Sequence, residues 1–437
     1  TLLSEVETQL LRGTGEKTAS PPDSLPKILL KILVLTALYP PLGHSGHDER
    51  CRLAVAGMSA CGHSLQVLTS RHRLPPIGAV DERGVFRELC LYEDSANTDQ
   101  LGEAYRETVI HESHNLGELR FRLARFQPDL VWVWNLKGLS KSLLFYLEDS
   151  DHQVVYDLHS DWLAGGTFDD DPWQNWWSSG RAGARLRRWW HSFVGPFRSR
   201  PPVPQVGQAG ELDLRHSYLC SESLRRKLIA AGIEGVRELP VIYPFADESR
   251  IPSKETYRPG GSRLMWAGRL SRLKAPELAL EALAIMRDRG IHLDLDIFAI
   301  GSPRERKLFR GRIDASGLGD RVNVRSIRPG ELVEHYHTYD CFLFTSRGDD
   351  PFPVTVQEAI LSGLPCILSR SGGIPEAIGE REDCIYVRNG DAEDLAAGIE
   401  RFLKLPDGGR ALAEACILGL RREGSFEKLR DHLELIA

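Results

Sequence analysis

The sequence predicts an α/β protein built from two parallel-sheet domains that face each other across a cleft. The chain has 437 residues, which is too long for one ordinary hydrophobic core and suits two. Continuous apolar runs such as 31–36 and 262–267 are typical of strands buried on both faces of a parallel sheet. Helical segments alternate with such runs along the chain, so we expect ligand-binding loops at the carboxyl edges of the strands.

The composition is that of a soluble globular protein, with 42% hydrophobic and 27% charged residues. A net charge of −6 gives no case for nucleic acid as a partner. The eight cysteines are scattered and form no C-x-x-C pair, which favours reduced thiols in the cytosol over a zinc site or a disulfide framework. No apolar run reaches the roughly 18–20 residues of a membrane span, and no signal peptide is evident, so we expect a cytoplasmic protein.

The first domain is expected over residues 27–244, after an N-terminal extension, 1–26, that Gly and Pro residues interrupt. Its first strand, 31–36, leads into a rigid loop that contains Gly43 and Gly46, where the backbone can approach a ligand closely. Further elements of this domain are expected as helices at 48–60, 116–126 and 224–231 and as strands at 65–69, 129–134, 153–158 and 216–220.

Residues 162–215 form an insertion rich in Trp and Arg. It holds six of the nine tryptophans of the chain, and the segment 172–210 has six arginines but no acidic residue. Such a segment suits the interface of an anionic membrane, or an acceptor lipid that carries phosphate. A packed insertion whose arginines pair with acids elsewhere explains the pattern equally well.

A linker is expected at 245–261 and the second domain at 262–420, followed by a C-terminal helix at 421–437. Arg269 and Lys274 follow the first strand of this domain, just before a helix. Two fixed cations beside the start of a helix suit a diphosphate. Further elements are expected as strands at 293–300, 322–326, 341–345 and 365–368 and as helices at 276–289 and 331–339.

A second polar segment, from Asp350 to Glu358, leads into an apolar helix expected over 356–361. The Glu358 carboxylate, at the start of this helix, can accept hydrogen bonds from a pair of ribose hydroxyls. Cations for a diphosphate and an acid for a ribose together describe a site for a nucleotide sugar.

The Gly-Arg-x4-Lys motif that ends at Lys274 and the acid-x7-Glu motif that ends at Glu358 resemble the donor site of retaining GT-B glycosyltransferases of the GT4 type. The resemblance implies two Rossmann-like domains, the second of which binds the nucleotide sugar. Arg269 and Lys274 would hold the donor diphosphate, and Glu358 the ribose. Asp350 stands where the family usually has Glu, near the transferred sugar. The residues between the two acids would line the donor site: Phe352, Pro353, Val354 and Thr355.

The first domain carries the resemblance further. The loop with Gly43 and Gly46 resembles the family's Tyr-Pro-Pro-x-x-Gly-Gly segment, which approaches the donor phosphates and the acceptor. The stretch 157–161 matches the place of the family's active-site histidine, His159, although alone it describes an ordinary loop histidine. The helix at 421–437 would cross back onto the first domain. Two other histidines are expected to be ordinary polar residues or contacts of the acceptor: His44 and His47.

The resemblance implies a metal-independent, hexosyltransferase-like enzyme without a cofactor, which moves a sugar from a nucleotide-diphosphate sugar to an acceptor hydroxyl with retention of configuration. Arg269 and Lys274 would stabilise the leaving diphosphate, Asp350 would hold the sugar and His159 would orient it. The setting would be glycan or glycolipid assembly, including polysaccharide biosynthesis. A lipid-linked acceptor and peripheral association with the inner face of the membrane through 162–215 would fit that setting.

Three other functions stay open from the sequence. A glycosyltransferase of this type can act on a soluble small-molecule acceptor. A nucleotide-sugar hydrolase or epimerase can use the same scaffold, and its products would form without an acceptor. An inactive sugar-nucleotide-binding protein would keep the cleft without turnover. Two departures from the family pattern favour this last function, namely Asp350 in place of Glu and Gly43-His-Ser-Gly46 in place of Gly-Gly. The joint presence of Arg269, Lys274, Glu358 and His159 opposes it.

Overall fold

The computed structural model describes most of the chain. The described residues are 29–41, 46–71, 83–92, 101–164, 171, 173–174, 203–204, 206–327, 330–348, 350–379, 381, 384–423 and 426–437. For 101–109 and 422–423 only the backbone is described. The expectations for the extension 1–26, for Gly43 and for most of the insertion 162–215 fall outside these residues.

The first domain is a six-stranded sheet with the strand order β3-β2-β1-β4-β5-β6, and its pairs are parallel. Ile32 of β1 (Lys31–Leu35) pairs with Leu65 on one side and with Leu130 on the other. The strand order therefore reverses between β1 and β4, where parallel sheets place a ligand crevice at their carboxyl edge. The remaining elements are α2 (Gly46–Ala60), β2 (Ser64–Ser70), β3 (Val85–Leu89), α3 (Leu101–Phe126), β4 (Leu130–Val133), α4 (Ser142–Glu148), β5 (Val154–Leu158), β6 (Tyr218–Leu219) and α7 (Glu222–Ala230).

The second domain repeats this plan with the strand order β12-β11-β10-β7-β8-β9. Here the order reverses between β7 (Arg263–Arg269) and β10 (Cys341–Phe344), so the loops that follow these two strands meet in a second crevice. The expected fold class, two parallel sheets with helices around them, is confirmed. The remaining elements are α8 (Pro276–Asp288), β8 (Asp294–Ile300), α9 (Pro303–Ala315), β9 (Val322–Arg325), α10 (Val354–Leu361), β11 (Cys366–Ser369), α11 (Gly373–Ile378), β12 (Ile385–Val387), α12 (Ala392–Leu403), α13 (Arg410–Glu423) and α14 (Phe426–Ile436).

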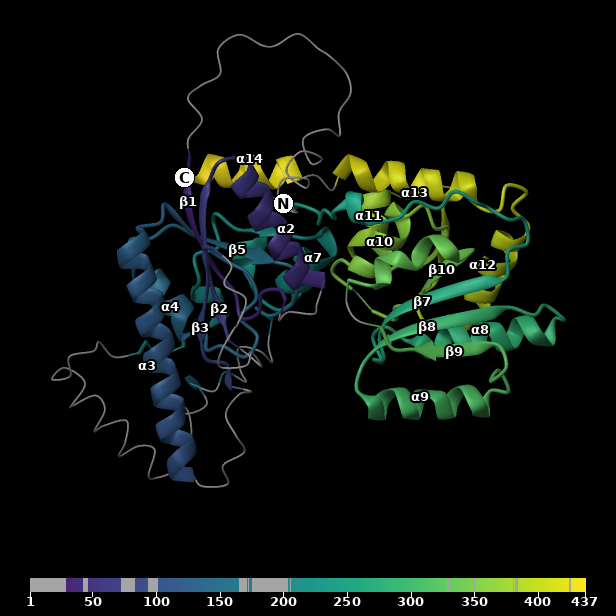
Figure 1. Cartoon of the computed structure of the whole chain (residues 1–437), viewed down its shortest axis with the longest axis horizontal. Helices are drawn as coiled ribbons and strands as arrows, with labels where there is room; N and C mark the ends of the chain where they lie inside the picture. The colour runs from purple at the N-terminus through teal and green to yellow at the C-terminus, as the bar shows by residue number, and fades with distance from the viewer. Residues whose placement is uncertain are drawn as a thin grey trace, which may run out of the picture.

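Helices α13 and α14 follow one another along one side of the molecule, α13 over the second domain and α14 over the first (Figure 1). Leu429 and Leu433 of α14 are buried in one cluster with Ile32 and Val34 of the first sheet. The chain thus returns to its first domain at its end, and the buried face of α14 completes the core there.

The sequence underestimated the helical content where helices are polar. The helix expected at 116–126 is the last part of the 26-residue α3. Helix α9 was not expected, since within it only Phe309 and Ile313 are buried, although Ser302 and Glu305 form a capping box at its start. The helix expected at 331–339 is instead two short 3-10 turns, 332–334 and 336–338. Strand β3 and helix α4 were also missed.

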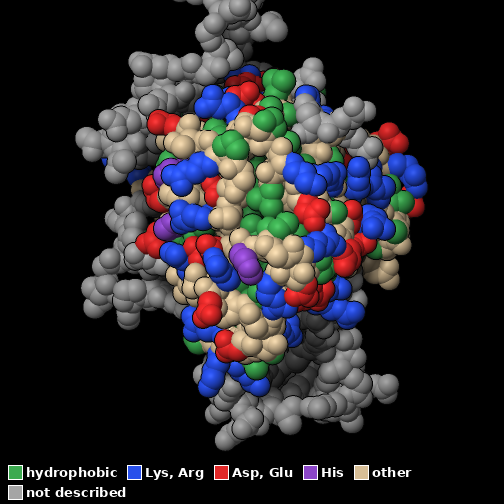
Figure 2. Space-filling model, turned by 90° about the vertical axis from the view of Figure 1, so that its right-hand side faces the viewer, with side chains coloured by type: hydrophobic (Ala, Val, Ile, Leu, Met, Phe, Trp, Pro, Cys, Tyr) green, Lys and Arg blue, Asp and Glu red, His purple; other side chains and the backbone are tan. Residues whose placement is uncertain are grey.

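The outer face of the second domain carries basic and acidic side chains in alternation, without a large field of one sign (Figure 2). Arg289 of α8 pairs with Glu393 and Glu400 of α12, which shows how such charges are matched between neighbouring helices. Among the described helices, none combines the length and the apolar character that a membrane crossing requires.

Two leucines of α14, one buried and one exposed, provide a matched pair of substitutions that tests whether this helix packs on the core. Leu433 is fully buried and Leu435, two residues on, is 85% exposed. Leu433→Ala should lower the free energy of unfolding of the first domain by about 2–5 kcal/mol, because it leaves a cavity, whereas Leu435→Ala should change it by less than about 0.5 kcal/mol. Thermal unfolding followed by calorimetry measures both, and equal shifts would show that α14 does not dock as described.

Candidate active site

Lys274 lies in a short loop between β7 and α8, and the side chain of Thr345 holds the backbone of this loop. The hydroxyl of Thr345, just after β10, accepts a hydrogen bond from Trp266 Nε1 (2.9 Å) and lies 2.9 and 3.0 Å from the carbonyl oxygens of Lys274 and Ala275. Ala275 has a left-handed backbone (φ +44°), which is uncommon for alanine. This clamp holds the strained turn and so fixes where the Lys274 side chain begins.

The Lys274 ammonium forms an ion pair with Asp350. Burial lowers the pKa of Lys274 to about 7, and the neighbouring charge of Arg269 is the second cause. The Asp350 carboxylate acts in the opposite direction, because it favours the protonated amine. Arg269, at the end of β7, is exposed and has no ion-pair partner among the described residues. The structure thus brings together three of the residues that the sequence predicted for the donor site.

Asp350 is 8% exposed and is enclosed by the Gly372-Gly373 turn. A Cβ atom on Gly372 would clash with the Asp350 backbone, and the backbone N–H of Gly373 donates to the carbonyl of Pro351 (3.0 Å). Glycine is therefore required at this turn, which supports the loop that carries Asp350.

Glu358 is the fifth residue of α10, which begins two residues earlier than expected. The hydroxyl of Tyr336 donates a hydrogen bond to its carboxylate (2.9 Å). Burial raises the pKa of Glu358 to about 7, although the Tyr336 bond lowers it, and Glu49 of the first domain raises it further. A half-buried acid with one fixed partner keeps lone pairs for further donors, such as a pair of hydroxyls.

The start of α10 forms the seam between the two domains. Its N-cap, Pro353, provides no side-chain cap, although its carbonyl accepts hydrogen bonds from the backbone N–H groups of Val356 and Gln357 (3.1 and 3.2 Å). A Cβ atom on Gly46, the first residue of α2, would lie 2.8 Å from the Val354 side chain. Phe352 is buried, and Thr355 lies 3.4 Å from the carbonyl of Ala267. Gly46 therefore permits a contact between domains that a larger residue would prevent.

On the first domain, the buried carboxylate of Asp157 is the centre of a polar network at the end of β5. Arg50 of α2 donates to both of its oxygens (2.9 and 3.1 Å), and Tyr218 of β6 donates to one (2.8 Å). His159 Nδ1 lies 3.0 Å from Oδ1. Burial would raise the pKa of Asp157, but Arg50, His159 and Tyr218 together hold it below its usual value.

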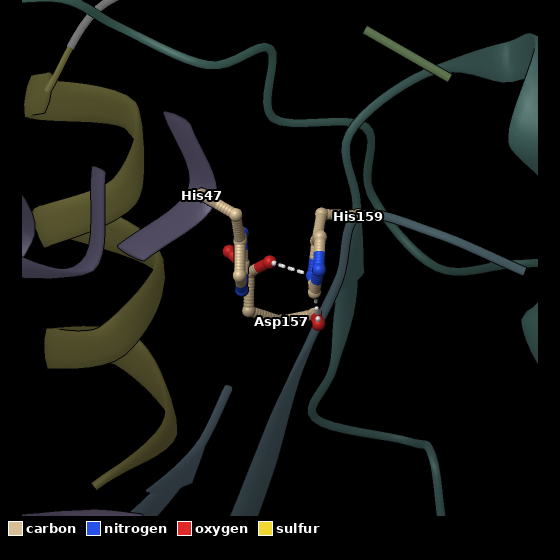
Figure 3. Close-up of side chains that lie close together, drawn as sticks. All are labelled: His47, Asp157 and His159. Atoms are coloured by element: carbon tan, nitrogen blue, oxygen red, sulfur yellow. Dashed lines mark hydrogen bonds and ion pairs between the residues drawn. The ribbon is translucent and has the colours of Figure 1, made fainter. Parts of the chain in front are cut away.

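His47 joins this network from α2 (Figure 3). Its ring stacks on His159, with centroids 3.0 Å apart and 11° between the planes. Nδ1 lies 3.4 Å from Arg50, and the buried Nε2 has no hydrogen-bond partner among the residues that the structure describes. Burial lowers the pKa of His47 well below the usual histidine value, with the charges of His159 and Arg50 as further causes. His47 is thus a neutral imidazole.

His47, Asp157 and His159 have the composition of a metal site, since their ligand atoms lie within 4.8 Å of one another. The geometry does not fit one. A metal ion binds imidazole nitrogen in the plane of the ring, and two nearly parallel stacked rings direct their lone pairs side by side. Arg50 also holds both oxygens of the carboxylate, and its positive charge opposes a cation there. As arranged here, these residues form a hydrogen-bond network.

The contact between Val354 and Gly46 links the two walls of the site, and within the first domain the neighbour of Gly46, His47, contacts His159. Sequence reasoning gave His47 little weight and missed Arg50, Tyr218, Tyr336 and Thr345. One signal for Arg50 was present, because Asp157 is an acid within an otherwise apolar strand, and a buried charge requires a partner. Gly43 cannot be placed, since it lies outside the described residues.

Residues 248–417 match the family model described as glycosyl transferases group 1. Among curated proteins, the D-inositol 3-phosphate glycosyltransferase of Arthrobacter sp. (strain FB24) is 30% identical over 161 residues, which are 35% of this chain and 38% of that protein. The curated relatives reported for this chain are matched over 35% to 64% of their own length. The match to the family model therefore lies in the linker and the second domain.

Among solved structures, sucrose-phosphate synthase from Thermosynechococcus elongatus has a TM-score of 0.63 at 16% identity, over 93% of this chain and 97% of that one. Anabaena Alr3699/HepE in complex with UDP-glucose has a TM-score of 0.61 at 15% identity, over 93% and 99%. Identities this low show the fold alone. The resemblance to GT-B glycosyltransferases of the GT4 type is confirmed in the GT-B fold of the chain and in the group 1 match of its second half.

The pKa of Lys274 predicts how the binding of a diphosphate depends on pH. A bound diphosphate raises this pKa from about 7, so binding takes up a proton, and the association constant should fall as the pH rises from 7 to 9, by up to tenfold per unit. Lys274→Arg stays charged and should flatten this dependence. Isothermal titration with UDP in buffers of different ionisation enthalpy measures the uptake; equal uptake in both proteins would refute the assignment.

Proposed function

We propose that this chain is a retaining glycosyltransferase that moves a sugar from a nucleotide-diphosphate sugar to an acceptor hydroxyl. The observation that supports this most is the set of charged residues at one edge of the second sheet. Lys274 and Arg269 lie close together after β7, and Glu358 stands on the helix that follows Asp350. The contact between Gly46 and Val354 places the first domain against this edge.

The chemistry requires that a diphosphate leave with its negative charge stabilised. Lys274 and Arg269 supply two cations on a turn that is held by Thr345, and preorganised charge of this kind lowers the barrier because little rearrangement is needed. In our proposal the diphosphate takes the place of Asp350 as partner of Lys274. Asp350 is then released to bind hydroxyls of the transferred sugar.

Glu358 binds the ribose in this proposal, and Tyr336 fixes the carboxylate for that purpose. His159 orients the transferred sugar from the first domain. We infer that two cations replace a divalent metal at the diphosphate, and that the departing phosphate assists the acceptor on the same face of the sugar, which retains the configuration. The second inference rests on the resemblance to the GT4 type.

The acceptor is proposed to belong to glycan or glycolipid assembly. A soluble phosphorylated acceptor is the second candidate, and the names of the curated relatives favour it, since these include D-inositol 3-phosphate glycosyltransferase and mannosylfructose-phosphate synthase. The nucleotide base is also open, although Alr3699/HepE was solved with UDP and UDP-glucose. A hydrolase or an epimerase would form products without an acceptor, which separates both from a transferase.

A thermal-shift screen with UDP, GDP, ADP and dTDP, each with and without a sugar and in the presence of EDTA, tests the donor site. At about 100 times its dissociation constant, the true ligand should add about 2.7 kcal/mol to the free energy of unfolding. Lys274→Ala should lose most of this gain and about 100-fold or more in rate, because a main partner of the diphosphate is removed.

Lys307→Ala is the matched control for this screen, because Lys307 is an exposed lysine on α9, the helix that follows a different strand, β8. It should behave like the unaltered protein. If no nucleotide diphosphate stabilises the protein, or if Lys274→Ala and Glu358→Ala both leave donor turnover unchanged, the proposed site is wrong.

Association with an anionic membrane is proposed through the basic part of 162–215. Two tryptophans of this segment do not contribute, since Trp173 is fully buried and donates to the carbonyl of Pro204 (2.8 Å), and Trp162 packs against the core. The protein should sediment with phosphatidylglycerol vesicles at low salt and should be released at high salt. Arg187→Gln with Arg188→Gln should weaken this binding; a protein that stays in the supernatant at low salt would remove the proposal.

A further inference from the structure

We propose that His47 is a sugar-binding residue, whose Nε2–H group donates a hydrogen bond to the same hydroxyl of the donor sugar that donates to His159 Nε2. The proposal rests on the proposed function, since it names a second ligand of the sugar in that site. Sequence reasoning gave His47 no role at the donor.

The tautomer of His47 follows from its neighbour. Arg50 is anchored by Asp157 through two hydrogen bonds, and a guanidinium can only donate. Nδ1 of His47, 3.4 Å from Nη2 of Arg50, must therefore be the acceptor. Because His47 is neutral, its one ring proton is on Nε2. This N–H group is buried, and no residue in the described part of the chain accepts from it, which is unfavourable unless a ligand oxygen does so.

In His159 the nitrogen that donates is Nδ1, whereas in His47 it is Nε2. Its Nδ1 lies 3.0 Å from Oδ1 of Asp157, and a carboxylate that is already held by Arg50 and Tyr218 accepts rather than donates. His159 therefore donates from Nδ1, and in its neutral form it carries the lone pair on Nε2. No described residue takes up that lone pair. The two stacked histidines thus offer one donor and one acceptor side by side.

A hydroxyl group is the ligand that matches this pair, because it donates one hydrogen bond and accepts others. A phosphate or carboxylate oxygen could accept from His47 but could not donate to His159. An ammonium group could donate to His159 but could not accept from His47. The pair is fixed before any ligand binds: the rings stack on one another, and Trp134 lies against His47 with centroids 5.1 Å apart. The donor sugar is favoured over the acceptor, since Gly46, next to His47, contacts Val354 on the segment that begins at Asp350.

The test compares the binding of UDP and UDP-glucose, or of the pair selected by the thermal-shift screen, to three variants by isothermal titration. His47→Phe keeps a ring for stacking but removes the N–H group, and should weaken UDP-glucose about tenfold while UDP is unaffected. His47→Gln can place an amide N–H near the position of Nε2 and should recover most of the affinity. His292→Phe, at an exposed histidine of the second domain, should match the unaltered protein.

The outcomes separate this inference from the proposed function. If the unaltered protein binds UDP-glucose and His47→Phe binds it equally well, His47 does not contact the donor sugar, and the inference fails while the proposed function stands. Equal losses for UDP and UDP-glucose would assign His47 to the diphosphate and would also overturn it. If the unaltered protein binds no nucleotide and no nucleotide sugar, both fail.

Discussion

The ion pair between Arg50 and Asp157 organises the first-domain wall of the cleft. It joins α2 to the end of β5 across 107 positions of the sequence, in a buried setting where neither charge is tolerable alone. Tyr218 and His159 take the remaining capacity of the carboxylate, and Arg50 sets the tautomer of His47. One buried carboxylate thus fixes two imidazole rings, and the polarity that these rings present follows from it.

The second-domain wall uses charge differently. Lys274 and Glu358 are opposite in sign, yet burial moves the pKa of each to about 7, because in both cases desolvation disfavours the charged form. A nearby charge therefore changes the protonation state of each group most strongly when the pH is close to 7. Their partners decide the outcome: Asp350 favours the charged lysine, and Tyr336 favours the charged glutamate. A ligand that carried both a diphosphate and hydroxyl groups would act on both side chains.

Local motifs of the sequence predicted the fold class well, and contacts between distant elements poorly; the roles of the donor residues stay a prediction. The apolar runs located most strands, because burial in a parallel sheet requires them. The spacing of Arg269, Lys274, Asp350 and Glu358 pointed to one site, and the structure brings the first three together. Tyr336, Thr345 and Arg50 were missed, since their roles depend on partners 22, 71 and 107 positions away. Helix α9 was missed because its buried face is only two residues wide.

The return of the chain to its first domain has a mechanical consequence. The backbone passes between the domains twice, after Ile242 and between α13 and α14. These two passages touch, since the rings of Phe245 and Phe426 meet edge to face with centroids 5.4 Å apart. Two adjacent covalent crossings restrict how the domains can rotate against one another, because any rotation must be absorbed at both crossings. A rotation about this point would move Gly46 relative to Val354 most easily while leaving the Phe245–Phe426 contact in place.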